Sequence, residues 1–159
     1  MADRNGEAPF IFLDYLQLLS PLSERYDDKK NVDVNVSELR KMARDLNTHI
    51  WAISSLNRAS YSGVISLDSY KESGGIEFGA DNLLGLQPRD MAAQLDDVPE
   101  TKRKRVAEKF TMANKRKIER DCELVILKRR NGAVPDNPVP LTFKTMAAYF
   151  IEPKGKRAR

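Results

Sequence analysis

Two apolar runs with a helix-forming segment between them constrain the fold more than any other feature of the sequence. The first run, Phe10–Leu13, has the length and aromatic content of a buried strand and is followed by Asp14. The second run, residues 49–54, lacks polar alternation, which is typical of a strand covered on both faces in a parallel sheet. Strand, helix and strand in this order predict a right-handed βαβ unit and therefore the α/β class.

The helix between these strands is expected over residues 35–48. Asn35 and Glu38 have the spacing of an N-terminal capping box. The apolar residues that share one face of this helix are Val36, Leu39, Met42, Ala43 and Leu46. Residues 20–33 are polar and rich in turn formers, so we expect a loop before the helix.

The remainder of the 159 residues, the size of one compact domain, predicts a charged helix and a terminal hairpin. The helix is expected over residues 99–120, inside a charged segment at about 89–121. The expected strands are residues 83–86, 123–128, 141–144 and 147–151, the last two forming the hairpin. Prolines at 135, 138 and 140 keep the preceding loop out of the centre of a sheet.

Positive charge is concentrated in two places. Of the 27 lysines and arginines, nine lie between Lys102 and Arg120, and four lie in the last six residues. Such clusters strengthen nucleic-acid binding through counterion release, or they are simply a solvated helix face and a disordered tail. Charge alone leaves both interpretations open.

Other classes of protein are disfavoured by composition. No apolar run approaches the roughly 20 residues that span a bilayer, and the N-terminus lacks the features of a signal peptide. The only cysteine, Cys122, has no internal partner for a disulfide, which fits a reducing compartment. We therefore expect no membrane association and a cytoplasmic location.

A more specific hypothesis rests on four segments that occur in one order. They are IFLDYLQLL at 11–19, VSELRKMARDLNTHIWAISSLNR at 36–58, KESGGIEFGAD at 71–81 and LKRRNGAVPDNPVPLTF at 127–143. Together they resemble the C-terminal half of the motor domain of DnaB-like replicative DNA helicases. The resemblance implies a partial RecA-like P-loop ATPase fold over residues 1–152, with a mostly parallel sheet flanked by helices and a C-terminal β-hairpin. Residues 153–159 would form a basic, disordered tail.

The resemblance implies a role for several residues at the nucleotide. Asp14 would be the Walker B carboxylate, holding Mg²⁺ beside the phosphates of ATP. Lys128 and Arg130 would be the trans-acting basic pair, with Arg130 as arginine finger for the neighbouring subunit. Two positions apart on a strand, they would point to the same side. The residues implied around the nucleotide after the second strand are Ser55, Asn57 and Arg58. The family usually has Gln where this chain has Ser55, so either another group substitutes or the coupling between nucleotide and DNA has decayed.

Single-stranded DNA is the expected partner of two further segments. Lys71, Glu72 and Gly74 match the family's DNA-binding loop, where a glycine lets a phosphate approach the backbone closely. The second segment holds the cations Lys102, Arg103, Lys104 and Arg105, for which DNA contact and a solvated helix face both stay open.

The phosphate-binding loop G-x-x-x-x-G-K-[ST] does not occur in this sequence. By itself the chain is therefore expected to be inactive and to expose an apolar sheet edge. We expect it to work in an ATP-dependent hexameric helicase, with further helicase subunits or a chain that carries the loop. The alternatives are a non-catalytic protein that binds helicase subunits or DNA, and a recombinase relative that shares the fold. A gene fragment, a split helicase and a degenerate regulator all fit the sequence.

Overall fold

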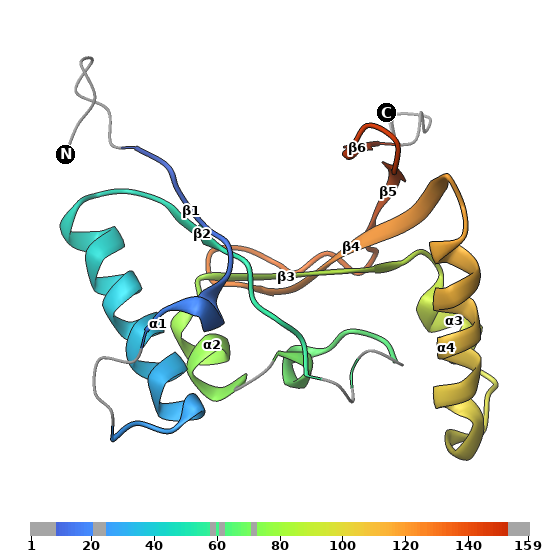
Figure 1. Cartoon of the computed structure of the whole chain (residues 1–159), viewed down its shortest axis with the longest axis horizontal. Helices are drawn as coiled ribbons and strands as arrows, with labels where there is room; N and C mark the ends of the chain where they lie inside the picture. The colour runs from blue at the N-terminus through green and yellow to red at the C-terminus, as the bar shows by residue number, and fades with distance from the viewer. Residues whose placement is uncertain (1–8, 21–24, 58–59, 61–62, 71–72, 153–159) are drawn as a thin grey trace. The chain divides into compact units, whose positions relative to one another are not determined.

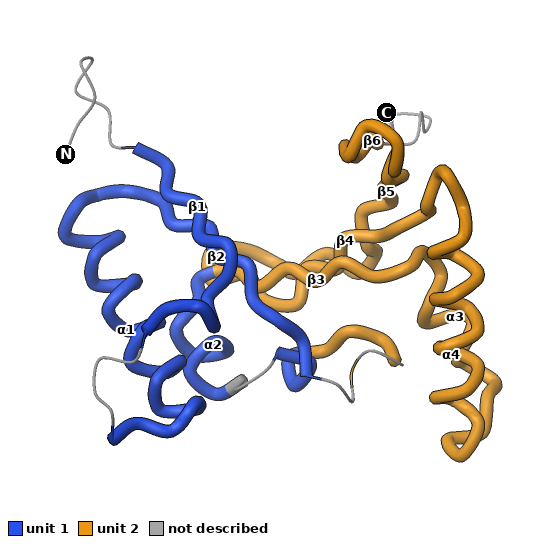
Figure 2. The backbone as a smooth tube through the Cα atoms, viewed as in Figure 1, with its two compact units in different colours: residues 1–57, 67–81 blue, residues 58–66, 82–159 orange. Residues whose placement is uncertain are grey.

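The structure is a computed structural model, and it describes residues 9–20, 25–57, 60, 63–70 and 73–152. The chain divides into two compact units (Figure 2). Unit 1 comprises Met1–Asn57 and Leu67–Asp81, and unit 2 comprises Arg58–Ser66 and Asn82–Arg159. Each unit has its own sheet, so the two are described in turn.

Unit 1 contains the predicted βαβ unit (Figure 1). Strands β1 (Ile11–Leu13) and β2 (Ile50–Ala52) are parallel, and Phe12 is paired with Trp51. The connection between them contains the 3-10 helix η1 (Leu16–Leu18) and helix α1 (Asp28–Asp45). The 3-10 helix η3 (Leu67–Ser69) and helix α2 (Ser73–Gly79) complete the unit, and α2 packs on α1. The prediction of strand, helix and strand is thus confirmed.

The predicted start of α1 is wrong by seven residues. Asp27 is the N-cap residue, and its side chain accepts a hydrogen bond from the backbone N–H of Lys30 at 2.7 Å. Asn35 lies inside the helix, where it is buried and donates to the Asn31 side chain at 3.2 Å. A capping box at Asn35 is therefore excluded, and the expected loop over 20–33 gives way to helix from Asp28. An acidic cap followed by a second acid favours this start, because negative charge stabilises the N-terminus of a helix.

The apolar side chains of β1 and β2 are exposed in this chain, although the sequence predicted strands buried on both faces. Phe12 is 77% exposed and Trp51 is 53% exposed, and both Phe10 and Ile53 are also exposed. We call these four residues the open sheet surface. Such large apolar residues at adjoining strand positions indicate a surface that packs against further polypeptide.

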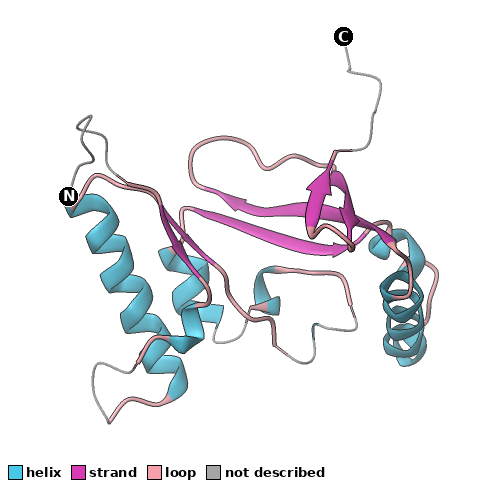
Figure 3. Ribbon diagram, turned by 45° about the horizontal axis from the view of Figure 1, so that its top comes forward, coloured by secondary structure: helices cyan, strands magenta, loops and turns pink. Residues whose placement is uncertain are grey.

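Unit 2 is built on a four-stranded antiparallel sheet in the order β3-β4-β5-β6 (Figure 3). Its strands are β3 (Asn82–Pro88), β4 (Glu119–Arg129), β5 (Val139–Lys144) and β6 (Tyr149–Ile151). The predicted strands over 123–128 and 83–86 lie inside β4 and β3. The predicted terminal hairpin is β5–β6, where the rings of Phe143 and Phe150 pack across the strands with centroids 4.7 Å apart.

Two helices connect β3 to β4, and they explain why these strands are antiparallel. Helices α3 (Met91–Leu95) and α4 (Glu100–Lys115) pack together at one end of the sheet (Figures 1 and 3). They return the chain to the point where β3 ended, and the Arg89 N–H donates to the Asp121 carbonyl at 3.1 Å. The α/β class, the charged helix and the hairpin are confirmed, but among the described strands only β1 and β2 are parallel.

The interior of unit 2 has an apolar part and a polar part. Met91, Leu95 and Ala107 form a buried cluster between α3 and α4. Beside the sheet, the buried Gln87 side chain accepts from the Ile65 N–H at 2.8 Å and donates to Glu123 at 2.6 Å. Of the helices that the structure describes, none has the length and apolar character needed to cross a bilayer.

Candidate functional site

Asp14 follows β1 directly and is exposed. The ends of β1 and β2 are joined by two backbone hydrogen bonds, from Ile53 to the Leu13 carbonyl at 2.9 Å and from Leu16 to the Ile53 carbonyl at 2.8 Å. Because parallel strands end at the same edge of a sheet, Asp14 lies beside the residues that follow β2. This carboxyl edge is where ligands bind in open α/β sheets.

Gln17 joins these two strand ends through its side chain, and sequence reasoning missed it. Its amide nitrogen donates to the Ser54 hydroxyl at 2.9 Å. Its amide oxygen accepts from the backbone N–H of Ser55 at 3.1 Å. A glutamine between two leucines in an otherwise apolar segment was the available signal. Gln17 therefore holds the segment after β2 against the segment that carries Asp14.

Asn57 has both its backbone and its side chain bonded to the segment that contains η3. Its side-chain amide donates to the Asp68 carbonyl at 2.6 Å, and its backbone N–H donates to the Ser69 carbonyl at 2.8 Å. A β-bridge between Leu56 and Tyr70 extends this attachment. Asn57 thus connects the end of β2 to the residues just before position 71. Ser55, the other residue expected near the nucleotide, is the one that Gln17 contacts.

Three of the predicted site residues lie outside the described residues: Arg58, Lys71 and Glu72. Gly74, the fourth member of the two segments concerned, is in the first turn of α2. A Cβ atom built on Gly74 would meet nothing within 4 Å, so its backbone is open to an approaching group. The two following glycines differ, because Gly75 packs against Asp33 and Gly79 packs against Val36.

Lys128 and Arg130 belong to unit 2. Lys128 is half-buried near the end of β4, next to a β-bulge that interrupts the pairing between β3 and β4. Arg130 is exposed and lies in a bend, because β4 ends at Arg129. The expectation that both side chains alternate along one strand is therefore wrong for Arg130. A bulge re-aims the side chains beyond it, which is frequent beside active sites.

The cations Lys102, Arg103, Lys104 and Arg105 are all exposed in the first turns of α4. The Arg103 guanidinium donates through Nε to the Val98 carbonyl at 3.0 Å, next to the start of the helix. Lys102, Lys104 and Arg105 point to different sides of the helix because successive residues are rotated by roughly 100°. The structure therefore does not bring these four cations onto one surface.

The surroundings of Asp14 can be compared with what Mg²⁺ requires. Within the described ranges, no three or more His, Cys, Asp or Glu side chains are grouped to hold a metal. Protein-bound Mg²⁺ usually keeps several waters and takes one or two carboxylates together with phosphate oxygens. A single exposed carboxylate at a sheet edge fits this coordination, whereas a site made of protein ligands alone does not fit.

Two buried titratable groups have shifted pKa values. Burial raises the pKa of the Tyr70 phenol above its ordinary value. Burial also raises the pKa of the Cys122 thiol, with the negative charge of Asp121 adding to the effect. A raised pKa keeps Cys122 in its thiol form, so it is poorly suited to act as a nucleophile.

Comparisons with known proteins agree with this arrangement. A family model described as the DnaB-like helicase C terminal domain matches residues 1–152. Replicative DNA helicase DnaB from two Helicobacter pylori strains, 26695 and J99, is 29% and 27% identical over 150 residues. These matches cover 84% of the chain and 31% of each relative, so the chain spans about a third of their length.

Solved structures show the same likeness. An ATPase domain matches with a TM-score of 0.69 and 26% identity, over 94% of this chain and 46% of that one. A DnaB-like replicative helicase, described with its interactions with primase, matches with a TM-score of 0.63 and 28% identity. That match covers 87% of this chain and 29% of the helicase. The RecA-like α/β class is thereby confirmed.

Proposed function

The chain belongs to the family of DnaB-like helicase C-terminal domains, and from this membership we propose that it is part of an ATP-dependent, hexameric replicative DNA helicase. Residues 1–152 would form part of the motor and 153–159 a basic tail. The observation that carries the proposal is Asp14 at the carboxyl edge of a parallel strand pair, with Gln17 holding the neighbouring strand end beside it.

Asp14 would hold Mg²⁺ through water beside the β- and γ-phosphates of ATP. The ion, when bound, neutralises charge that develops on the phosphates. Asp14 suits this task because it is exposed and directly follows a strand that Leu13 and Ile53 fasten to its neighbour. The carboxylate is therefore kept in place without being buried.

Gln17 and Asn57 would connect the nucleotide to the DNA-binding loop. The family has Gln at the position of Ser55, and the Gln17 amide in this chain already contacts the Ser55 backbone. From there the chain runs two residues to Asn57, which is bonded to Asp68 and Ser69. A displacement at the sheet edge would thus be passed to the residues that precede the loop. We propose Gln17 as the group that substitutes for the missing glutamine.

The loop with Lys71, Glu72 and Gly74 would contact the backbone of single-stranded DNA. Support for this comes from Gly74, whose backbone has no neighbour that would hinder a phosphate. Phosphate contacts by charged side chains and backbone N–H groups position a protein without reading sequence. The same loop in each subunit would then follow the strand as the nucleotide state of its interface changes.

Lys128 and Arg130 would act on the nucleotide held by a neighbouring subunit. Arg130 is exposed in a bend just after β4, and a guanidinium keeps its charge and binds phosphate oxygens through a planar fork. Lys128 would supply a second positive charge near the end of the same strand. Both roles require a second subunit, which fits a ring of subunits.

A chain or segment with the phosphate-binding loop is required as a further partner, because the 159 residues contain no G-x-x-x-x-G-K-[ST]. The open sheet surface is the proposed place for it, since Phe10, Phe12, Trp51 and Ile53 are exposed apolar residues on a sheet. Removing such a surface from water contributes about 25 cal/mol per Å². We propose a cytoplasmic location for the assembly.

DNA-stimulated ATP hydrolysis is the experiment that tests the proposal. The chain is measured alone and mixed with a fragment of a DnaB-like motor that carries the phosphate-binding loop. Activity is expected only in the mixture. It should be lost with Arg130→Ala and kept with Arg129→Ala, a matched change one residue earlier.

The second candidate function is a non-catalytic protein that binds helicase subunits. Two observations favour it: Ser55 in place of glutamine, and an apolar surface available for docking. Stable association with the partner fragment but no hydrolysis in the mixture would establish this alternative and refute the motor.

A further inference from the structure

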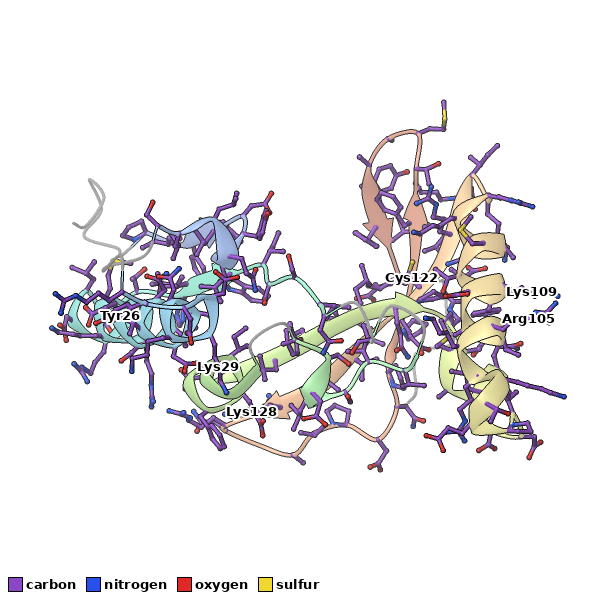
Figure 4. The ribbon with its side chains drawn as sticks, turned by 60° about the horizontal axis from the view of Figure 1, so that its bottom comes forward. Tyr26, Lys29, Arg105, Lys109, Cys122 and Lys128 are labelled. Carbon is purple, nitrogen blue, oxygen red and sulfur yellow. The ribbon has the colours of Figure 1, made fainter. Side chains whose placement is uncertain are left out.

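One face of α4 presents cations in a regular row. Lys102 and Arg105 lie roughly opposite the buried Ala107, and the same face continues through Lys109, Met112 and Arg116 at spacings of three and four residues. All five side chains are exposed, including 53% of Met112. We call this row the α4 stripe. Figure 4 shows Arg105 and Lys109 projecting from the same side of the helix.

The opposite face fixes the helix in unit 2. Ala107 is fully buried against Met91 and Leu95. Near the C-terminus of the helix, the buried Asn114 side chain donates to the Asp121 carbonyl at 3.0 Å. The α4 stripe is therefore held by a packed face before any ligand arrives, which lowers the entropy cost of binding.

The charge of the stripe is not neutralised within the described residues. The segment Glu100–Lys115 has six basic and two acidic residues, a net charge of +4, which equals the net charge of the whole chain. Elsewhere in unit 2, Arg89 and Lys117 pair with the carboxylate of Asp121. In the described part of the chain, no comparable ion pair involves a cation of the stripe.

We propose that the α4 stripe binds the sugar-phosphate backbone of nucleic acid, as a contact additional to the loop at 71–74. From Lys102 to Arg116 the row is roughly 21 Å long at 1.5 Å per residue, so it offers charge to several successive phosphates. A shallow hollow of about 360 Å³ lies on it; its lining residues are Arg105, Glu108, Lys109, Met112, Ala113 and Arg116. Met112 supplies an apolar contact for a sugar or a base between the cations.

A nucleic acid fits this surface better than an acidic protein segment. The row is long, regular and open, which suits a polymer with evenly spaced charges. The two arginines offer planar forks for phosphate oxygens. The inference deepens the DNA-binding part of the proposed function and rests on it for the kind of polymer, but it requires neither ATP nor the phosphate-binding loop.

Salt-dependent binding of a labelled single strand and of a duplex of equal length, measured by fluorescence anisotropy without nucleotide, tests the proposal. The stripe variant is Arg105→Gln with Arg116→Gln. The matched control is Lys104→Gln with Lys115→Gln, which removes two exposed charges one position earlier, roughly 100° around the helix. Equal circular dichroism spectra confirm that both variants are folded.

Each lost phosphate contact lowers the slope of log K against log salt by about 0.7 for a single strand and about 0.9 for a duplex. The stripe variant should therefore lose about 1.4 or about 1.8, and the control should keep the slope of the unaltered chain. An unchanged slope in the stripe variant, or equal losses in both variants, overturns the stripe.

Two further outcomes have separate meanings. Polyglutamate that displaces DNA as well as an equally charged oligonucleotide does would make the stripe a docking surface for acidic protein, against the proposal. Absence of DNA binding by the unaltered chain would overturn both the stripe and the DNA-binding part of the proposed function. The hydrolysis experiment remains a separate test of the motor.

Discussion

Alanine at two neighbouring glycines of α2 should change stability in opposite directions. A Cβ atom on Gly75 would lie 2.1 Å from Asp33 Oδ1 and 2.8 Å from the Asp33 Cα atom. The Cα atom is backbone and cannot rotate away, so α1 and α2 would have to move apart. A Cβ atom on Gly74 would meet nothing within 4 Å. Gly75→Ala is therefore expected to destabilise unit 1, and Gly74→Ala to stabilise it.

The size of the difference follows from two opposing terms. Both substitutions gain about 1 kcal/mol of helix propensity, and this gain cancels when the variants are compared. Overpacking at Gly75→Ala costs about 1–3 kcal/mol. With a urea dependence of about 2 kcal/mol per molar, the two midpoints should differ by about 0.5–1.5 M.

Urea unfolding followed by tryptophan fluorescence measures this difference. Trp51 is the only tryptophan of the chain and lies in β2, so its emission reports on unit 1. Equal midpoints for Gly75→Ala and Gly74→Ala would refute the close approach of α2 to α1 at Asp33.

Three further variants test other parts of the structure. Gln17→Leu removes two hydrogen bonds and leaves the Ser55 N–H without its partner, so unit 1 should lose about 1–3 kcal/mol by the same assay, and an unchanged midpoint contradicts the clamp. Because burial raises the pKa of Tyr70, the folded chain holds this proton more tightly than the unfolded chain; the free energy of unfolding should fall as pH rises above about 10, less so in Tyr70→Phe, and identical pH profiles would exclude this cause. Ala107→Leu should cost about 1–3 kcal/mol in thermal unfolding by circular dichroism, whereas Ala113→Leu on the exposed side of α4 should be nearly neutral.

The elements that could be predicted from the sequence are those with a strong local pattern. The apolar runs around Leu13 and Ile50 and the hairpin after Val139 have the residue types and period of strands, and the structure has strands there. The start of α1 was misplaced because two capping patterns compete within eight residues. Asp27 provides the cap, and Asn35 instead becomes a buried helix residue.

Asp14 could be anticipated as a site residue because its position depends only on where one strand ends. Gln17 could not, since its partners Ser54 and Ser55 lie 37 and 38 residues further along the chain. Asn57 was expected beside a nucleotide, yet its amide is bonded to a carbonyl of the η3 segment. Contacts between distant segments depend on how the segments pack, and local residue patterns do not contain that information.

The sequence by itself determined the kinds of elements, their order and the family motifs, because strand and helix periods and short motifs are properties of neighbouring residues. Only the tertiary structure decided that β4 runs antiparallel to β3, that Gly75 is packed while Gly74 is open, and that Arg105 rather than Lys104 joins the α4 stripe. The physical reason is the same in each case. Residues of one type are locally equivalent until another part of the chain packs against one of them and leaves the other in water.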